Sequence, residues 1–147
     1  MNAGPDLDED TYQSVVALCK VGDALADEEK FIEAIEKYTR AWSLLPEPKT
    51  DWGASTWILA AVADAAFLSD QLQLARDSLA TAMTCPDGIG NPFLHLRYGQ
   101  TLFELGVLDE AADELMRAYM GGGAEVFSAE DPRYLAFLSS RARLAVH

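Results

Sequence analysis

Basic residues are scarce in this sequence. Its 147 residues include 11 lysines and arginines against 24 aspartates and glutamates, which gives a formal net charge of −13 at pH 7. A protein that binds nucleic acid needs an excess of positive charge to displace counterions from the phosphate backbone. The composition therefore argues against that class and favours a protein that attracts basic partners.

Cysteine and long apolar runs are also rare. Cys19 and Cys85 are the two cysteines, in neither a C-x-x-C pair nor a metal-ligand spacing, so we expect reduced core thiols in a cytoplasmic protein. The longest apolar run, residues 57–68, spans 12 residues and contains Asp64, which is too short for a membrane span. The first ten residues carry four carboxylates and no basic residue, unlike a secretory signal or a mitochondrial presequence.

Glycine and proline together number 10 + 6 = 16 residues, while 50% of the chain is apolar. This composition predicts a folded chain rather than a disordered one. The length suits one domain with a real core, and we expect a single domain over residues 1–147.

One helical pattern occurs three times. In each copy a small residue is followed by a large apolar residue four positions later and by alanine seven positions later, all on one helix face. The three sets are Ala34, Tyr38 and Ala41; Ala75, Leu79 and Ala82; and Ala111, Leu115 and Ala118. Twelve residues before each first alanine stands another small residue: Gly22, Ala63 and Gly99. We therefore expect pairs of antiparallel helices that approach closely at these small residues.

This arrangement resembles the tetratricopeptide repeat (TPR), a helical hairpin that stacks into a solenoid. The resemblance covers residues 15–48, 56–89 and 92–125. The first copy matches best, the second is degenerate, and the third ends in Gly123 where proline is usual. The resemblance implies an all-α fold of three hairpins and a C-terminal capping helix over residues 132–145, about seven helices in all.

The first alanines of the copies lie 41 and 36 residues apart, more than the regular spacing of about 34. The additional residues fall in segments 46–53 and 85–92, whose prolines, glycines and aspartates predict loops. Helices are expected at about 8–28, 30–45, 52–69, 71–84, 92–105, 108–120 and 132–145. Asp131 and Pro132 suit the start of the last helix, whose apolar residues, among them Ala142 and Leu144, are expected to cover the end of the stack.

Residues suited to catalysis are few. His95 stands at a core position of its repeat, His147 ends the chain, and no serine lies in a G-x-S-x-G context. The aspartates of residues 6–10 imitate the start of a calcium loop, but the glycine and glutamate that such a loop requires are absent. We therefore expect no enzyme, no cofactor and no metal site.

The TPR resemblance also implies where a partner binds, because the first helix of each hairpin lines the concave wall of such solenoids. The corresponding positions hold aromatic side chains among carboxylates, a composition typical of a protein-binding hot spot for a basic partner. The expected partner-binding residues are Asp23, Asp27, Trp57, Asp64, Phe67, Phe93, Arg97, Gln100, Phe103 and Glu104. A clamp for an acidic peptide, as in TPR co-chaperones, needs several cations, whereas Arg97 is the only cation near these positions.

Longer segments make the family resemblance more specific than the repeat pattern does. These segments are residues 44–52, 56–61, 90–97, 118–127 and 130–138. They resemble small bacterial TPR proteins encoded beside polymorphic or contact-delivered toxins. That resemblance implies a non-catalytic immunity protein that binds and neutralises a cognate toxin, expected to be a basic protein domain, with neither nucleic acid nor membrane as partner. Two alternatives are a TPR adaptor or secretion chaperone that holds an extended segment of its partner, and a hydrolase that uses Asp64 with His95.

Overall fold

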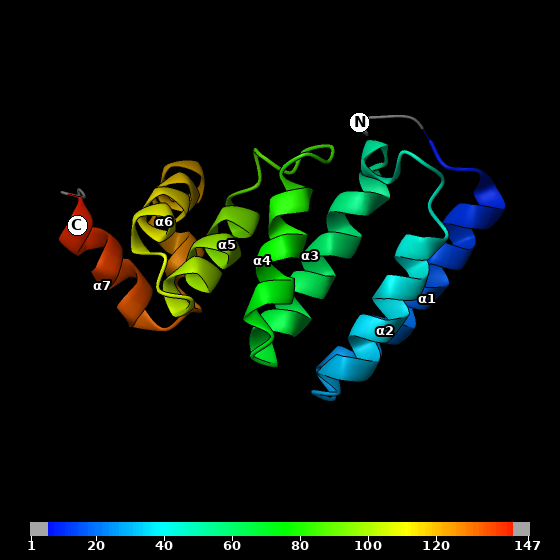
Figure 1. The fold of residues 1–147 in the computed structure, drawn as a ribbon, viewed down its shortest axis with the longest axis horizontal. Coiled ribbons are helices and arrows are strands. Elements are labelled where there is room, and N and C mark those ends of the chain that lie inside the picture. The colour runs from blue at the N-terminus through cyan, green and yellow to red at the C-terminus, as the bar shows by residue number, and fades with distance from the viewer. Residues whose placement is uncertain (1–5, 143–147) are drawn as a thin grey trace. The chain divides into compact units, whose positions relative to one another are not determined.

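Helices form all the regular structure of residues 6–142, the part of the chain that the computed structural model describes. The chain divides into two compact units, unit 1 (Met1–Ile89) and unit 2 (Gly90–His147). Figure 1 shows the helices as ribbons, coloured from blue to red along the chain. The all-α fold of helical hairpins is thus confirmed, while the expectation of a single domain stays a prediction.

Unit 1 consists of two helical hairpins. The first pairs α1 (Glu9–Asp27) with α2 (Phe31–Ser43), and the second pairs α3 (Gly53–Leu68) with α4 (Leu72–Ala82). A 3-10 turn, η1 (Lys49–Asp51), lies between the hairpins, and α2 packs against α3. In Figure 1 α1 and α2 lie side by side, as do α3 and α4.

Unit 2 contains the third hairpin and the capping helix. It consists of α5 (Pro92–Glu104), α6 (Leu108–Gly122), the 3-10 turn η2 (Ala124–Phe127) and α7 (Pro132–Arg141). Asn91 caps α5 by accepting hydrogen bonds from the backbone amides of the first turn, and Asp131 caps α7 by accepting from Arg133 N. The cap predicted at Asp131, with Pro132 in the first turn, is confirmed.

The small residues of the pattern do bring paired helices together. A Cβ atom placed on Gly22 of α1 would lie 2.5 Å from Cε1 of Tyr38 on α2. A Cβ atom on Gly99 of α5 would lie 2.6 Å from Cγ of Leu115 on α6. Contacts this short cannot be accommodated without movement, so glycine sets the spacing of both hairpins.

The three hairpins share one type of turn. Glu29, Asp70 and Gly106 occupy its left-handed position, with φ values of 60°, 64° and 81°. In each turn the next residue donates its backbone amide to a carbonyl five positions earlier, for example Lys30 N to Leu25 O at 2.9 Å. This is the Schellman arrangement that ends helices, and it repeats at the 41- and 36-residue spacing of the sequence pattern.

The predicted helix boundaries hold to within two residues except at the last helix. That helix ends at Arg141 and not at about 145, because Ala142 has an extended backbone with φ −144° and ψ 148°. Tyr134 and Leu138 of α7 are buried, as a capping helix requires. Leu144 and His147 lie outside the described residues. The turns η1 and η2 were not expected, since a single helical turn leaves no hydrophobic period in the sequence.

The core residues of the sequence pattern are buried. All nine members of the three sets are at most 2% exposed, and both cysteines are buried and unpaired, as predicted. Burial, with a smaller effect of the nearby Asp23 carboxylate, raises the pKa of the Cys19 thiol to about 11. The thiol is therefore inert near neutral pH.

Candidate functional site

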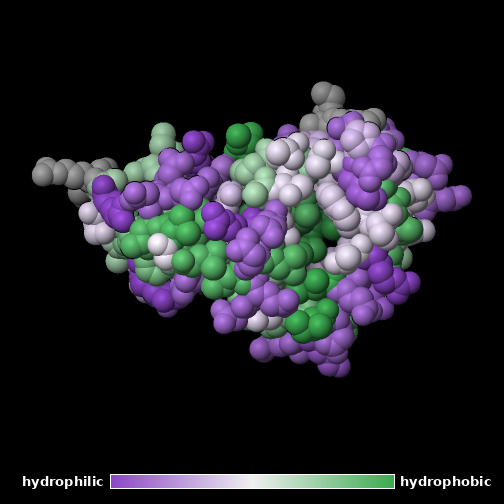
Figure 2. Space-filling model, in the orientation of Figure 1, coloured by the Kyte–Doolittle hydropathy of each residue, from purple (hydrophilic) through white to green (hydrophobic). Residues whose placement is uncertain are grey.

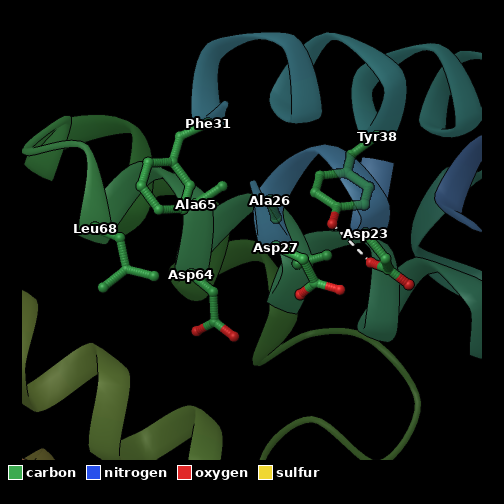
Figure 3. A pocket seen from close by; sticks show the side chains of 9 residues that line it. Asp23, Ala26, Asp27, Phe31, Tyr38, Asp64, Ala65 and Leu68 are labelled. Carbon is green, nitrogen blue, oxygen red and sulfur yellow. Dashed lines mark hydrogen bonds between the residues drawn. The ribbon is translucent and has the colours of Figure 1, made fainter. Parts of the chain in front are cut away.

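A pocket of about 480 Å³ opens in unit 1, where α1, α2 and α3 meet. Its size lies within the range of about 300–1,000 Å³ that is usual for ligand-binding pockets. We call it the acidic pocket; it is lined by Asp23, Ala26, Asp27, Phe31, Tyr38, Ala61, Asp64, Ala65 and Leu68. It is shown from close by in Figure 3.

The acidic pocket has an aromatic side and a carboxylate side. In Figure 3 the rings of Phe31 and Tyr38 descend from α2, while the carboxylates of Asp23, Asp27 and Asp64 lie in a row opposite them. Asp23 and Asp27 belong to α1 and lie four residues apart, one turn of the helix. Asp64 belongs to α3. Three elements therefore supply a surface that is aromatic on one side and negatively charged on the other.

One hydrogen bond fixes the position of a carboxylate in this row. The hydroxyl of Tyr38 donates to Oδ1 of Asp23 at 2.7 Å, and the tyrosine side chain is 2% exposed. Burial of the ring, together with this bond to Asp23, raises the pKa of Tyr38 well above its ordinary value. The tyrosine thus remains a neutral donor, and Asp23 is held at the edge of the pocket.

The charged residues that line the acidic pocket are all acidic. Asp23, Asp27 and Asp64 are all exposed, and none of the nine residues that line the pocket is basic. Nevertheless, within residues 6–142 no group of three or more His, Cys, Asp or Glu side chains is arranged to hold a metal ion.

Half of the predicted partner-binding residues lie in unit 1. Asp23, Asp27 and Asp64 come together in the acidic pocket, as described above. Trp57 and Phe67 lie on α3 but do not line the pocket; Trp57 is 40% exposed and Phe67 is half-buried. Figure 2 shows that hydrophobic groups also lie among hydrophilic ones on the surface of the molecule.

The other half lie in unit 2, and several of them contact their own unit. Gln100 is fully buried, donates to Glu130 Oε1 at 2.6 Å and accepts from Arg97 Nη1 at 3.0 Å. Arg97 also lies 3.7 Å from the Glu130 carboxylate. Phe93 differs from them, because its side chain is 65% exposed at the start of α5. The partner-binding role of these residues stays a prediction.

Phe103 and Glu104 hold the capping helix. The Phe103 ring lies 5.5 Å from the ring of Tyr134, edge to face, and 4.9 Å from the ring of Phe137. Glu104 accepts hydrogen bonds from the Tyr134 hydroxyl, at 2.7 Å, and from the guanidinium of Arg133. Burial, and then the bond to Glu104, raises the pKa of Tyr134 to about 12.

His95 is part of the core of unit 2. It is 5% exposed, and its Nδ1 atom lies 2.6 Å from Oε1 of Glu114 on α6. The expectation of a core histidine is therefore confirmed. No helix within residues 6–142 has the length and apolar character needed to cross a membrane.

The sequence pattern did not predict the aromatic side of the acidic pocket. Phe31 and Tyr38 stand on the second helix of their hairpin, whereas partner contacts were expected from first helices alone. Tyr38 was recognised only as a core residue. The available signal was Phe31 itself, an apolar residue that stands three positions before the first alanine of the copy, Ala34.

Comparison with known proteins supports the fold. No protein-family model matches the chain, and no curated protein matches it in sequence. Among solved structures, it is similar to the C-terminal TPR-containing domain of a Plasmodium falciparum protein described as FK506-binding, with a TM-score of 0.73 and 16% identity. The similarity covers 92% of this chain and 90% of that one. The TPR-like arrangement of helices expected from the sequence is therefore confirmed.

Proposed function

We propose that this chain is a non-catalytic module that binds another protein, and that its partner is a toxin which it neutralises. The observation that carries the proposal is the acidic pocket, which places exposed carboxylates beside aromatic and aliphatic side chains on rigid helices. Aromatic anchors next to charges of one sign are typical of protein-binding surfaces. The TPR-like fold supports the same reading, because stacked hairpins offer extended binding surfaces.

The charge of the chain supports a basic partner. A net charge of −13 generates a negative field that accelerates the encounter with a positively charged protein. Rapid and tight capture is what neutralising a toxin requires. A preformed helical surface limits the conformational entropy that is lost on binding.

The residues that were considered for catalysis support a structural role. His95 is buried against Glu114, and Cys19 and Cys85 are buried thiols. A hydrolase that uses Asp64 with His95 would have to show turnover that His95→Ala abolishes. We expect no such turnover.

The experiment uses the protein whose gene lies next to the gene that encodes this chain. Co-expression of the two should give a stoichiometric complex in size-exclusion chromatography with light scattering. The neighbouring protein alone should arrest growth, and this chain should restore it. A neighbouring protein that forms no complex, or that arrests growth equally in the presence of this chain, contradicts the proposal.

The state of the bound partner separates immunity from the adaptor or secretion chaperone. A neutralised toxin stays folded, whereas a chaperone holds an extended segment of its substrate. Hydrogen exchange of the partner in the complex distinguishes the two. Slow amide exchange throughout a folded domain supports immunity, and fast exchange outside one short protected segment supports the alternative.

A further inference from the structure

We propose that the acidic pocket receives an arginine side chain of the partner. This inference rests on the proposed function, because it names the group by which a basic protein would be recognised. Three observations carry it: the charge of the pocket, the position of Phe31 across from the carboxylates, and the aliphatic surface at one end.

The charge selects a cation. Asp23 and Asp27 are exposed, Asp64 lines the same pocket, and no basic residue lines it. The carboxylates come from two helices and are not grouped as ligands of a metal ion within the described residues. A larger organic cation can contact carboxylates spread in a row, and guanidinium offers five N–H donors in one plane.

An aromatic ring selects a flat cation. Phe31 and Tyr38 lie on the side of the pocket that faces the carboxylate row (Figure 3), but Tyr38 is 2% exposed, so the partly exposed Phe31 is the ring that a ligand can contact. A guanidinium group stacks on aromatic faces while its edge donates to carboxylates, whereas an ammonium is a compact and strongly hydrated charge. The Tyr38 hydroxyl is already used by Asp23, at 2.7 Å. Phe31 and Asp27 are therefore the two residues on which the proposal mainly depends.

The aliphatic end accommodates the stem of the side chain. Leu68 is 56% exposed, although it is a large apolar residue, and it lines the pocket together with Ala61 and Ala65. Arginine buries its methylene groups along apolar surfaces and keeps its charge beside polar groups. The exposed Leu68 can therefore contact the methylene groups of an arginine side chain whose guanidinium lies beside the carboxylates.

The test is a titration of the full chain with three capped tripeptides, followed by NMR. The peptides carry arginine, lysine or citrulline between two alanines; citrulline keeps the shape of arginine without its charge. The arginine peptide should shift the signals of Ala26, Ala61, Ala65 and Leu68 and bind more tightly than the other two. Equal binding of citrulline and arginine, or shifts confined to other residues, overturns the proposal.

Variants locate the binding site. Asp27→Asn should weaken arginine binding between about two- and fivefold, the range for one exposed charge pair, and Phe31→Leu should remove the preference for arginine over lysine. Glu33→Gln is the matched control, since Glu33 is an exposed carboxylate of α2 that does not line the pocket. An equal loss in Asp27→Asn and Glu33→Gln overturns the proposal, because general electrostatic attraction would then explain the binding.

The result is separable from the proposed function. If wild type and Asp27→Asn neutralise the neighbouring protein equally well, and the wild type shows no preference for the arginine peptide, the proposed function stands and the arginine proposal is wrong. If the chain prefers the arginine peptide but binds no neighbouring protein, the arginine proposal stands and the proposed function is wrong.

Discussion

The substitution Gly99→Ala tests how the hairpins are held together. The added Cβ would lie 2.6 Å from Cδ2 and Cγ of Leu115 and 3.0 Å from its backbone nitrogen. Overpacking of this kind destabilises by about 1–3 kcal/mol, while alanine improves helix propensity over glycine by about 1 kcal/mol. The overpacking equals or exceeds the gain in helix propensity, and the free energy of unfolding should fall by up to about 2 kcal/mol.

Shortening the Leu115 side chain should reverse the effect of Gly99→Ala on stability. Leu115→Ala alone leaves a cavity and destabilises by about 2–5 kcal/mol. In that background the two contacts with the Leu115 side chain are removed and the contact with its backbone nitrogen at 3.0 Å remains, so Gly99→Ala should be neutral or stabilise by up to about 1 kcal/mol. The double-mutant cycle therefore predicts a coupling energy of about 1–3 kcal/mol between the two sites.

Urea denaturation followed by circular dichroism measures all four proteins. Gly90→Ala is the control, because a Cβ atom there would meet nothing within 4 Å and should change stability by at most about 0.5 kcal/mol. If Gly99→Ala has the same effect in both backgrounds, the close approach of α5 and α6 does not limit the side chain, and the reasoning is refuted.

Three further predictions concern a turn, a thiol and a cap. Glu29→Gly should stabilise the protein by about 0.5–1 kcal/mol, because glycine adopts the left-handed conformation of this turn without steric cost. Gly106→Ala should destabilise it. Thermal melts measure both effects, and a shift of the melting temperature in the same direction for both variants would contradict the turn assignment. The Cys19 thiol has a pKa of about 11 against an ordinary 9.0, so the folded state retains a proton that the unfolded state releases. Stability should therefore fall between these two pH values, and less steeply in Cys19→Ala; parallel pH profiles would exclude this contribution. Asn91→Ala should lower unfolding free energy by about 1 kcal/mol through loss of the α5 cap, and an unchanged urea midpoint would contradict it.

The sequence predicts the helices because their hydrophobic period is strong. Ala34, Tyr38 and Ala41 occupy one face at helical spacing, and the same face recurs in the other two copies. The small residue twelve positions earlier favours a close contact between the paired helices, and that contact is present at Gly22 and Gly99. The cap at Asp131 follows from local chemistry, because an aspartate before a proline suits the start of a helix.

Other features depend on contacts that no local pattern records. The left-handed turns at Glu29 and Asp70 carry no glycine, so nothing in their composition marks them. Phe103 meets Tyr134 across 31 residues of sequence, and that pairing follows from the docking of α7. The aromatic side of the acidic pocket comes from α2, where Phe31 stands in the first turn, directly after the left-handed turn that joins α2 to α1.

The most direct test of the account is the dissociation constant of the complex between this chain and the protein encoded beside it. Isothermal titration calorimetry would compare the wild type, Asp27→Asn and Glu33→Gln at low and moderate salt. We predict a tight wild-type complex that weakens with salt, a further loss in Asp27→Asn, and no comparable loss in Glu33→Gln. A chain that binds no neighbouring protein, or one whose affinity is unaffected by both salt and Asp27→Asn, would contradict the account.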